Sequence, residues 1–152
     1  VPVYLGAQDL QLLRRSWSPP WNHHKGAFHR LVRRLYSLSG LDIRPVSDGE
    51  HIGSFRAAHT PGHNPGHTVF FHTASEAAML GDLVWNTDRG FVSPPWLDSY
   101  DTDRIAESIE RIAEEPFDAA CMGHGPPVET GGRDRLAALV SELDARTGRS
   151  GP

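Results

Sequence analysis

Three short segments of the chain each place a strong metal ligand beside glycine. They are HTPGH with His63, LGD with Asp82 and MGHG with His124. Each follows a segment expected to be a strand, and glycine lets the backbone approach a shared site closely at such loops. Imidazole nitrogen and carboxylate oxygen bind zinc at about 2.0–2.2 Å. The three segments therefore predict one metal-binding cleft, although their spacing alone does not enforce it.

Nine histidines in 152 residues are also unusual, since roughly three or four are expected at this length. His59 and His67 flank the first ligand segment, so they are candidates for residues that orient the ligands or line a substrate pocket. A purely structural hydrogen-bonding role is an equal alternative for both. His72 falls inside an expected strand and is interpreted as structural. The remaining histidines near the Pro/Trp loop are interpreted as solvated loop residues in preference to a cover for the cleft: His23, His24 and His29.

The elements that must position these ligands follow from hydrophobic periodicity. Helices are predicted from near Gln8, with Leu10 and Leu13 inward, and over 28–38, 103–115 and 133–145. Strands are predicted over 68–73, 77–80 and 117–122, and a hairpin is predicted from 41–46 and 52–59 through the Asp48-Gly49 turn. Strands mixed with amphipathic helices indicate an α/β or α+β domain.

Composition excludes several classes of function. The net charge is −4 and basic residues occur only in short pairs, so the chain offers no electrostatic basis for binding nucleic acid. No segment resembles a secretory signal or a membrane span, and no membrane partner is expected. The single cysteine, Cys121, cannot form an intrachain disulfide. A cytoplasmic location is the default expectation.

The run HTPGHNPGH, then GD after a strand, then a helix and GHG, resembles the C-terminal half of the metallo-β-lactamase superfamily. That group includes glyoxalase II-like thioesterases and lactonases. The resemblance implies an α/β fold, the αββα sandwich, present here as its C-terminal portion, with a mixed sheet and flanking amphipathic helices. Residues 1–147 would form one partial domain and 148–152 a flexible tail. It implies that His63 binds one metal, Asp82 bridges two, and His124 binds the second.

The chain departs from this superfamily at its principal signature. HxHxDH, which supplies the other four ligand positions, is absent, and HHKGAFH has the wrong spacing and no aspartate. Each metal would then have two ligands from this chain, fewer than the three expected at catalytic zinc. We expect that an N-terminal portion is missing, and that residues 1–152 alone bind metal weakly and hydrolyse little.

The predicted function is a metal-dependent hydrolase with two Zn²⁺ in its complete site, while iron and manganese also suit these donors. Its substrate would be a small ester, thioester, lactone or similar carbonyl compound, attacked by hydroxide that the metal makes available near pH 7. The alternative is a non-catalytic remnant or binding module of the same fold. If a sheet layer is missing, copies are expected to associate through strand faces around Phe55, Val69 and Phe71.

Overall fold

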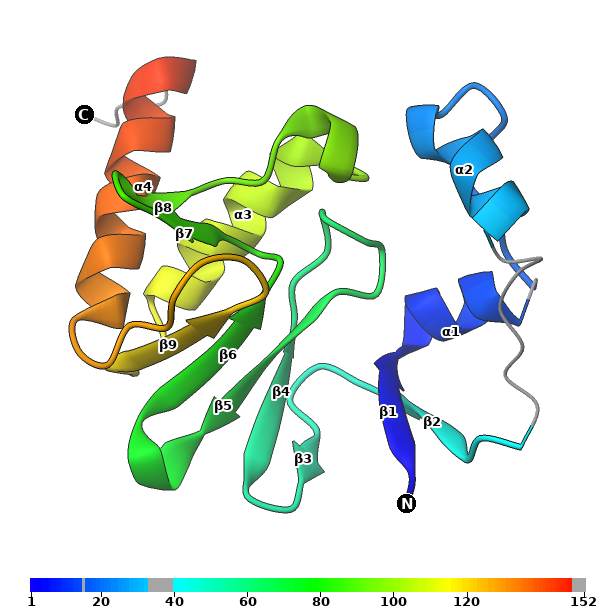
Figure 1. Cartoon of the computed structure of the whole chain (residues 1–152), viewed down its shortest axis with the longest axis horizontal. Coiled ribbons are helices and arrows are strands. Elements are labelled where there is room, and N and C mark those ends of the chain that lie inside the picture. The colour runs from blue at the N-terminus through cyan, green and yellow to red at the C-terminus, as the bar shows by residue number, and fades with distance from the viewer. Residues whose placement is uncertain (15, 33–39, 149–152) are drawn as a thin grey trace.

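A five-stranded mixed sheet forms the centre of the computed structural model, which describes residues 1–14, 16–32 and 40–148 (Figure 1). The strand order is β3-β4-β5-β6-β9; β3 to β6 pair antiparallel, and β9 pairs parallel with β6. Consequently β4, β6 and β9 run in the same direction, and their carboxyl ends meet at one edge. The strands are β3 His51–Ile52, β4 Phe55–His59, β5 Thr68–His72, β6 Ala77–Gly81 and β9 Ala119–Met122.

Two amphipathic helices, α3 (Thr102–Ala113) and α4 (Gly132–Thr147), cover one face of this sheet. The α3 helix begins where the Asp101 carboxylate accepts hydrogen bonds from the backbone N–H groups of Asp103 and Arg104. Its apolar stripe is fully buried against alternate residues of the strands. The core includes Val69, Phe71, Ala78, Leu80, Ile105, Ile109, Ile112 and Leu136.

The remaining elements lie beside the five-stranded sheet and the two helices that cover it. β1 (Val3–Gly6) and β2 (Ile43–Val46) form a parallel two-stranded sheet, and β7 (Trp85–Thr87) and β8 (Gly90–Val92) form a hairpin. The helices α1 (Ala7–Leu13) and α2 (His24–Val32) lie on the same side of the molecule as β1 and β2 (Figure 1). Short 3₁₀ turns are η1 (Thr73–Ser75) and η2 (Trp96–Asp98). In the parts of the chain that the structure describes, no helix is both long and apolar enough to cross a membrane.

The α/β class with a mixed sheet and flanking helices is confirmed, and β5, β6, β9, α3 and α4 lie where periodicity predicts them. The predicted hairpin of 41–46 with 52–59 is wrong, because β2 pairs with β1 and β4 pairs with the short β3. Pro45 lacks a backbone N–H, which suits an edge strand of a small sheet. The sequence analysis did not predict β1, the strand with which β2 pairs.

The first two helices also differ from the prediction. In α1 the buried residues are Leu10 and Leu12, while Leu13 is only half-buried. The α2 helix begins at His24, inside the segment expected to be a loop, and its Phe28 and Leu31 are 59% and 63% exposed. The first turn of this helix is held by polar contacts of His24 and Lys25. The predicted helix over 33–38 and the tail at 149–152 lie outside the described residues.

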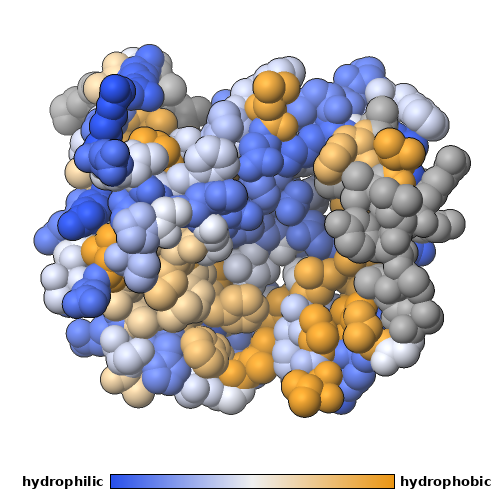
Figure 2. All heavy atoms as spheres, in the orientation of Figure 1, coloured by the Kyte–Doolittle hydropathy of each residue, from blue (hydrophilic) through white to orange (hydrophobic). Residues whose placement is uncertain are grey.

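The sheet face opposite α3 and α4 carries an apolar groove of 270 Å³. Figure 2 shows apolar surface on the lower part of the molecule, where these strands lie. The prediction that Phe55, Val69 and Phe71 share one exposed strand face is right only for Phe55, which lines the groove. Val69 and Phe71 are 0% and 4% exposed beneath the helices. Side chains alternate along a strand, so Phe70 faces the groove in their place. The groove is lined by Tyr4, Ile52, Phe55, Phe70 and Met79.

We predict that copies of the chain associate through this groove, because burying its apolar surface is favourable. Sedimentation velocity should show oligomers that dissociate in the double variant Phe55→Thr, Phe70→Thr. Leu31→Thr, which also removes an exposed apolar side chain but lies outside the groove, is the matched control and should leave the oligomers intact. A monodisperse wild-type monomer would contradict the prediction.

Candidate metal centre

The carboxylate of Asp82 lies between the two predicted histidine ligands. His63 Nε2 is 3.6 Å from Asp82 Oδ2, and His124 Nε2 is 3.6 Å from Asp82 Oδ1. The three residues follow β4, β6 and β9, whose carboxyl ends share one edge of the sheet. The topology therefore brings together all three side chains that the sequence singled out.

The spacing of these atoms fits shared metal ligation. Two ligand atoms that are each about 2.1 Å from a tetrahedral ion lie about 3.4 Å apart. The two observed separations of 3.6 Å are close to this value and too long for direct hydrogen bonds. Asp82 Oδ1 is moreover buried without a hydrogen-bond partner, and a buried carboxylate oxygen requires one. A cation near Asp82 would satisfy it.

Within residues 1–14, 16–32 and 40–148, no group of three or more His, Cys, Asp or Glu side chains is arranged to surround one ion. The contacts instead form two pairs that share Asp82, each pair using a different carboxylate oxygen. This is the arrangement that a bridging aspartate would take, with two ligands from this chain at each position. His63 is 11% exposed, Asp82 33% and His124 59%, so the open side of the site is at His124.

His67 holds the backbone of Asp82 through a hydrogen bond. Its Nε2 accepts a hydrogen bond from the Asp82 backbone N–H at 3.2 Å, so Nδ1 carries the proton and donates to Thr60 Oγ1 at 2.8 Å. Burial, and then the neighbouring His63, lower the pKa of His67 to about 4. Both ring nitrogens are occupied, which favours a supporting role for His67 over direct ligation.

His59 closes the loop that carries His63. Its Nε2 donates to the carbonyl oxygen of Pro65 at 2.9 Å, and its backbone N–H donates to Asp48 Oδ1 at 2.7 Å. The ring also borders a small pocket of 260 Å³ whose walls include Trp17 and Tyr100. The structure thus places His59 at the base of the ligand loop and not between the two ligand pairs.

Gly123 lets the third segment lie close to Asp82. A Cβ atom on Gly123 would lie 2.2 Å from Asp82 Oδ1, so any side chain there would have to displace the Asp82 carboxylate. On the other side of this segment, the Trp85 ring lies 4.7 Å from the His124 ring. Gly123 therefore allows His124 and Asp82 to approach, while Trp85 limits where the imidazole can turn.

Two residues near His63 were missed from the sequence. Asp98 Oδ2 lies 3.8 Å from His63 Nδ1, and the buried Lys25 donates from Nζ to the backbone carbonyl of His63 at 3.2 Å. Burial, and then the positive charge of Lys25, lower the pKa of His63. Lys25 sits in the HHKG run, which contains ligand-type residues. It is 38 positions from His63 and Asp98 is 35 positions from it, and no spacing in the sequence connects either residue to that site.

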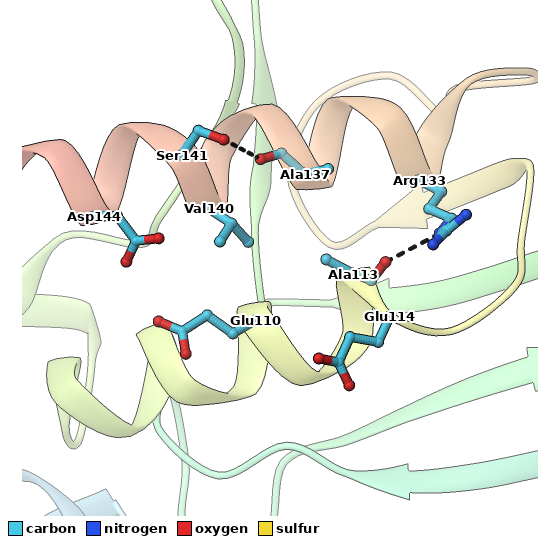
Figure 3. A pocket seen from close by; sticks show the side chains of 8 residues that line it. All are labelled: Glu110, Ala113, Glu114, Arg133, Ala137, Val140, Ser141 and Asp144. Carbon is cyan, nitrogen blue, oxygen red and sulfur yellow. Dashed lines mark hydrogen bonds between the residues drawn. The ribbon is translucent and has the colours of Figure 1, made fainter. Parts of the chain in front are cut away.

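A separate groove of 620 Å³ lies between α3 and α4, and Figure 3 shows the side chains that line it. Arg133 Nε donates to the carbonyl of Ala113, and Ser141 Oγ donates to the carbonyl of Ala137. None of the three predicted ligands borders this groove, which is a polar seam between two packed helices. The candidate centre is therefore at the sheet edge.

Comparison with solved structures identifies the fold of the chain. The chain is 21% identical to the metallo-beta-lactamase family protein TTHA1429 from Thermus thermophilus, with a TM-score of 0.66 over 98% of this chain and 55% of that one. It is 28% identical to TTHA1623 in a di-iron-bound form, with a TM-score of 0.63 over 90% of this chain and 63% of that one. The chain has the metallo-β-lactamase fold. The resemblance indicated by the three motifs is confirmed.

Among curated proteins, this metallo-β-lactamase-fold chain is 25% identical to the "Probable metallo-hydrolase YflN" of Bacillus subtilis (strain 168). The match covers 95% of this chain and 63% of that protein. No family model matches the chain. The chain thus spans between about half and two thirds of the length of these relatives.

We predict that acid destabilises the metal-free fold through His67. Its pKa is about 4 when folded and about 6.5 when unfolded, so the unfolded chain binds more protons below pH 6.5 and stability falls as the pH drops towards 4. Between pH 7 and 5 this amounts to about 2 kcal/mol, measurable by urea denaturation. The pH dependence should weaken by about this amount in His67→Gln, while the part due to His63 remains, and it should persist in full in His51→Gln, a change at an exposed histidine. An equal pH dependence in both variants would contradict it.

We also predict that Gly123→Ala impairs metal binding without unfolding the protein. The added methyl group must displace the Asp82 carboxylate, while the backbone at this position needs no left-handed conformation. Zinc affinity, measured by competition with a chromogenic chelator, should fall at least about tenfold. Ala119→Ser, which adds one atom to the same chain segment away from Asp82, should retain the affinity. Unchanged affinity in Gly123→Ala would show that Asp82 does not bind the ion as described.

Proposed function

We propose that this chain is the part of a metal-dependent hydrolase that holds one side of a dinuclear centre, with zinc as the expected metal. The observation that carries the proposal is that each oxygen of Asp82 faces a different histidine at 3.6 Å. The curated relative is named a metallo-hydrolase, which supports hydrolysis as the reaction class. TTHA1623 carries two irons, so iron remains an alternative to zinc for these donors.

We propose one pair of ligands for each metal position. His63 Nε2 and Asp82 Oδ2 would hold one ion, and His124 Nε2 and Asp82 Oδ1 would hold the other. When bound, such ions supply the Lewis acidity that makes hydroxide available near pH 7 and polarises a carbonyl oxygen. We propose an ester, thioester, lactone or similar small carbonyl compound as the substrate.

The protein side chains determine access and orientation around these ligands. His63 is almost fully enclosed, whereas His124 is more than half exposed, so a substrate would approach from the His124 side. The Trp85 ring against His124 provides an apolar wall at this entrance. Neither serine nor cysteine is needed as a nucleophile in this proposal.

The complete site requires more ligands than this chain provides. Catalytic zinc takes three protein ligands, and each pair here offers two. The relatives are longer than the region that this chain matches. We propose that a further polypeptide portion supplies the remaining ligands, as the HxHxDH segment does in the superfamily that the motifs resemble.

A second candidate function is a binding module that keeps the fold without a working metal centre. The absence of a three-ligand group among the described residues favours it. The two candidates differ in whether His63, Asp82 and His124 hold metal at all. Metal binding is therefore the property to measure first.

We predict that residues 1–152 bind Zn²⁺ weakly and through these three side chains. Elemental analysis after equilibrium dialysis should show zinc in the wild type, and His63→Ala, Asp82→Ala and His124→Ala should each lower the affinity at least about tenfold, since each removes one of only two ligands. His51→Ala, an exposed histidine elsewhere, is the matched control. Binding that survives all three substitutions would overturn the proposed centre, and no binding by the wild type would favour the binding module.

A further inference from the structure

Three consecutive side chains at the start of α2 bind four backbone carbonyls near the candidate centre. His23 Nε2 donates to Tyr100 O at 2.8 Å, and His24 Nε2 donates to Ser99 O at 2.7 Å. Lys25 Nζ donates to Asp98 O and to His63 O. We refer to His23, His24 and Lys25 as the clasp.

The clasp is ordered by its own contacts and by those of its targets. The Lys25 backbone N–H donates to His23 Nδ1, which leaves His23 Nε2 as the donor toward Tyr100. The His23 and Tyr100 rings stack with centroids 4.2 Å apart, and the His24 ring lies 4.5 Å from Trp96. The clasp therefore contacts residues 98–100 through hydrogen bonds and the Tyr100 ring, and it also contacts the Trp96 ring.

Residues 98–100 are bonded in turn to the loop that carries His63. The Tyr100 backbone N–H lies within hydrogen-bond distance of Gly62 O at 2.8 Å and of His63 O at 3.0 Å. Lys25 adds a direct link, because one ammonium group bonds a carbonyl in each of the two loops. Lys25 is 8% exposed, and leaving such a charge without these acceptors would be costly.

The result of this arrangement is a defined environment for both nitrogens of His63. Nε2 lies 3.6 Å from Asp82 Oδ2, and Nδ1 lies 3.8 Å from Asp98 Oδ2 and is buried without a hydrogen-bond partner. Lys25 holds the backbone of Asp98 through its carbonyl, and the carboxylate of the same residue faces the imidazole. A negative carboxylate beside the far nitrogen of a histidine favours the proton on that nitrogen, and a hydrogen bond between the two, which needs an approach of less than about 1 Å here, orients the ring when the near nitrogen binds a metal ion.

We infer that Asp98 and the clasp are positioning residues that hold His63 with its proton on Nδ1 and with Nε2 available to a metal ion. The inference rests on the proposed function, because it assigns these residues to the same centre. It gives a role to two of the histidines that the sequence analysis interpreted as solvated. Lys25 connects the α2 helix to the centre, and Asp98 acts on the imidazole itself.

The first test is the protonation pattern of His63 in the metal-free protein. Long-range ¹H–¹⁵N NMR correlation at pH 8 should show the Nδ1–H form in the wild type, identified by loss of its signals in His63→Gln. Asp98→Asn should yield a mixture of the two neutral forms, and Lys25→Met should do the same. Lys25→Arg, which retains donors, should restore the wild-type pattern in part. Asp88→Asn, an exposed aspartate in the β7–β8 turn, is the matched control.

The second test is the affinity for Co²⁺, followed by its visible absorption. Asp98→Asn and Lys25→Met should weaken binding about 10- to 100-fold, the range typical of residues that orient a ligand, while thermal unfolding of Asp98→Asn stays near that of the wild type. A wild-type His63 protonated on Nε2, or variants with unchanged pattern and affinity, would overturn the inference. If Co²⁺ binding is also insensitive to His63→Ala, it is the proposed function that fails, and the NMR pattern still decides the role of Asp98.

Discussion

The backbone N–H of Asp82 donates to His67, and the rest of the candidate centre depends on that contact. It fixes the carboxylate at the end of β6, between the loops that follow β4 and β9. The hydrogen bond also requires a neutral imidazole with its proton on the Thr60 side, which explains why a buried histidine is suitable here. A carboxamide or hydroxyl at position 67 would have to reproduce an acceptor and a donor at the same two points.

The direction of the strands then determines what can meet Asp82. Antiparallel pairing from β4 to β6 and parallel pairing from β6 to β9 bring three carboxyl ends to one edge. The helices that cover the sheet on one face supply its stability, whereas the candidate ligands lie at its edge, where loops can present side chains. The opposite face carries an apolar groove, so the two faces of the sheet differ in what covers them. The helices bury the first face, and the predicted association of copies would bury the second.

The parts of this structure that were predictable are those set by local patterns. The apolar stripe of α3, the alternation in β5 and β6, and the glycine-flanked ligands are all visible in the sequence. The pairing of β2 with β1 was not predictable, because residues 40 positions apart in sequence carry no signal for it. Lys25 and Asp98 were missed for the same reason: their relation to His63 exists only after α2 and η2 have packed beside the ligand loop.

Because β9 pairs in parallel with β6, we expect the two ligand pairs of the candidate centre to form at different stages of folding. β4, β5 and β6 are consecutive strands joined by short connections, whereas β9 pairs with β6 only across a crossover that includes α3. Closing that longer loop costs more chain entropy. His63 and Asp82 thus belong to the locally formed part of the sheet, and His124 joins through the last pairing. A local opening of β9 would release one ligand pair and leave the other in place, so the two positions of the centre need not share one lifetime.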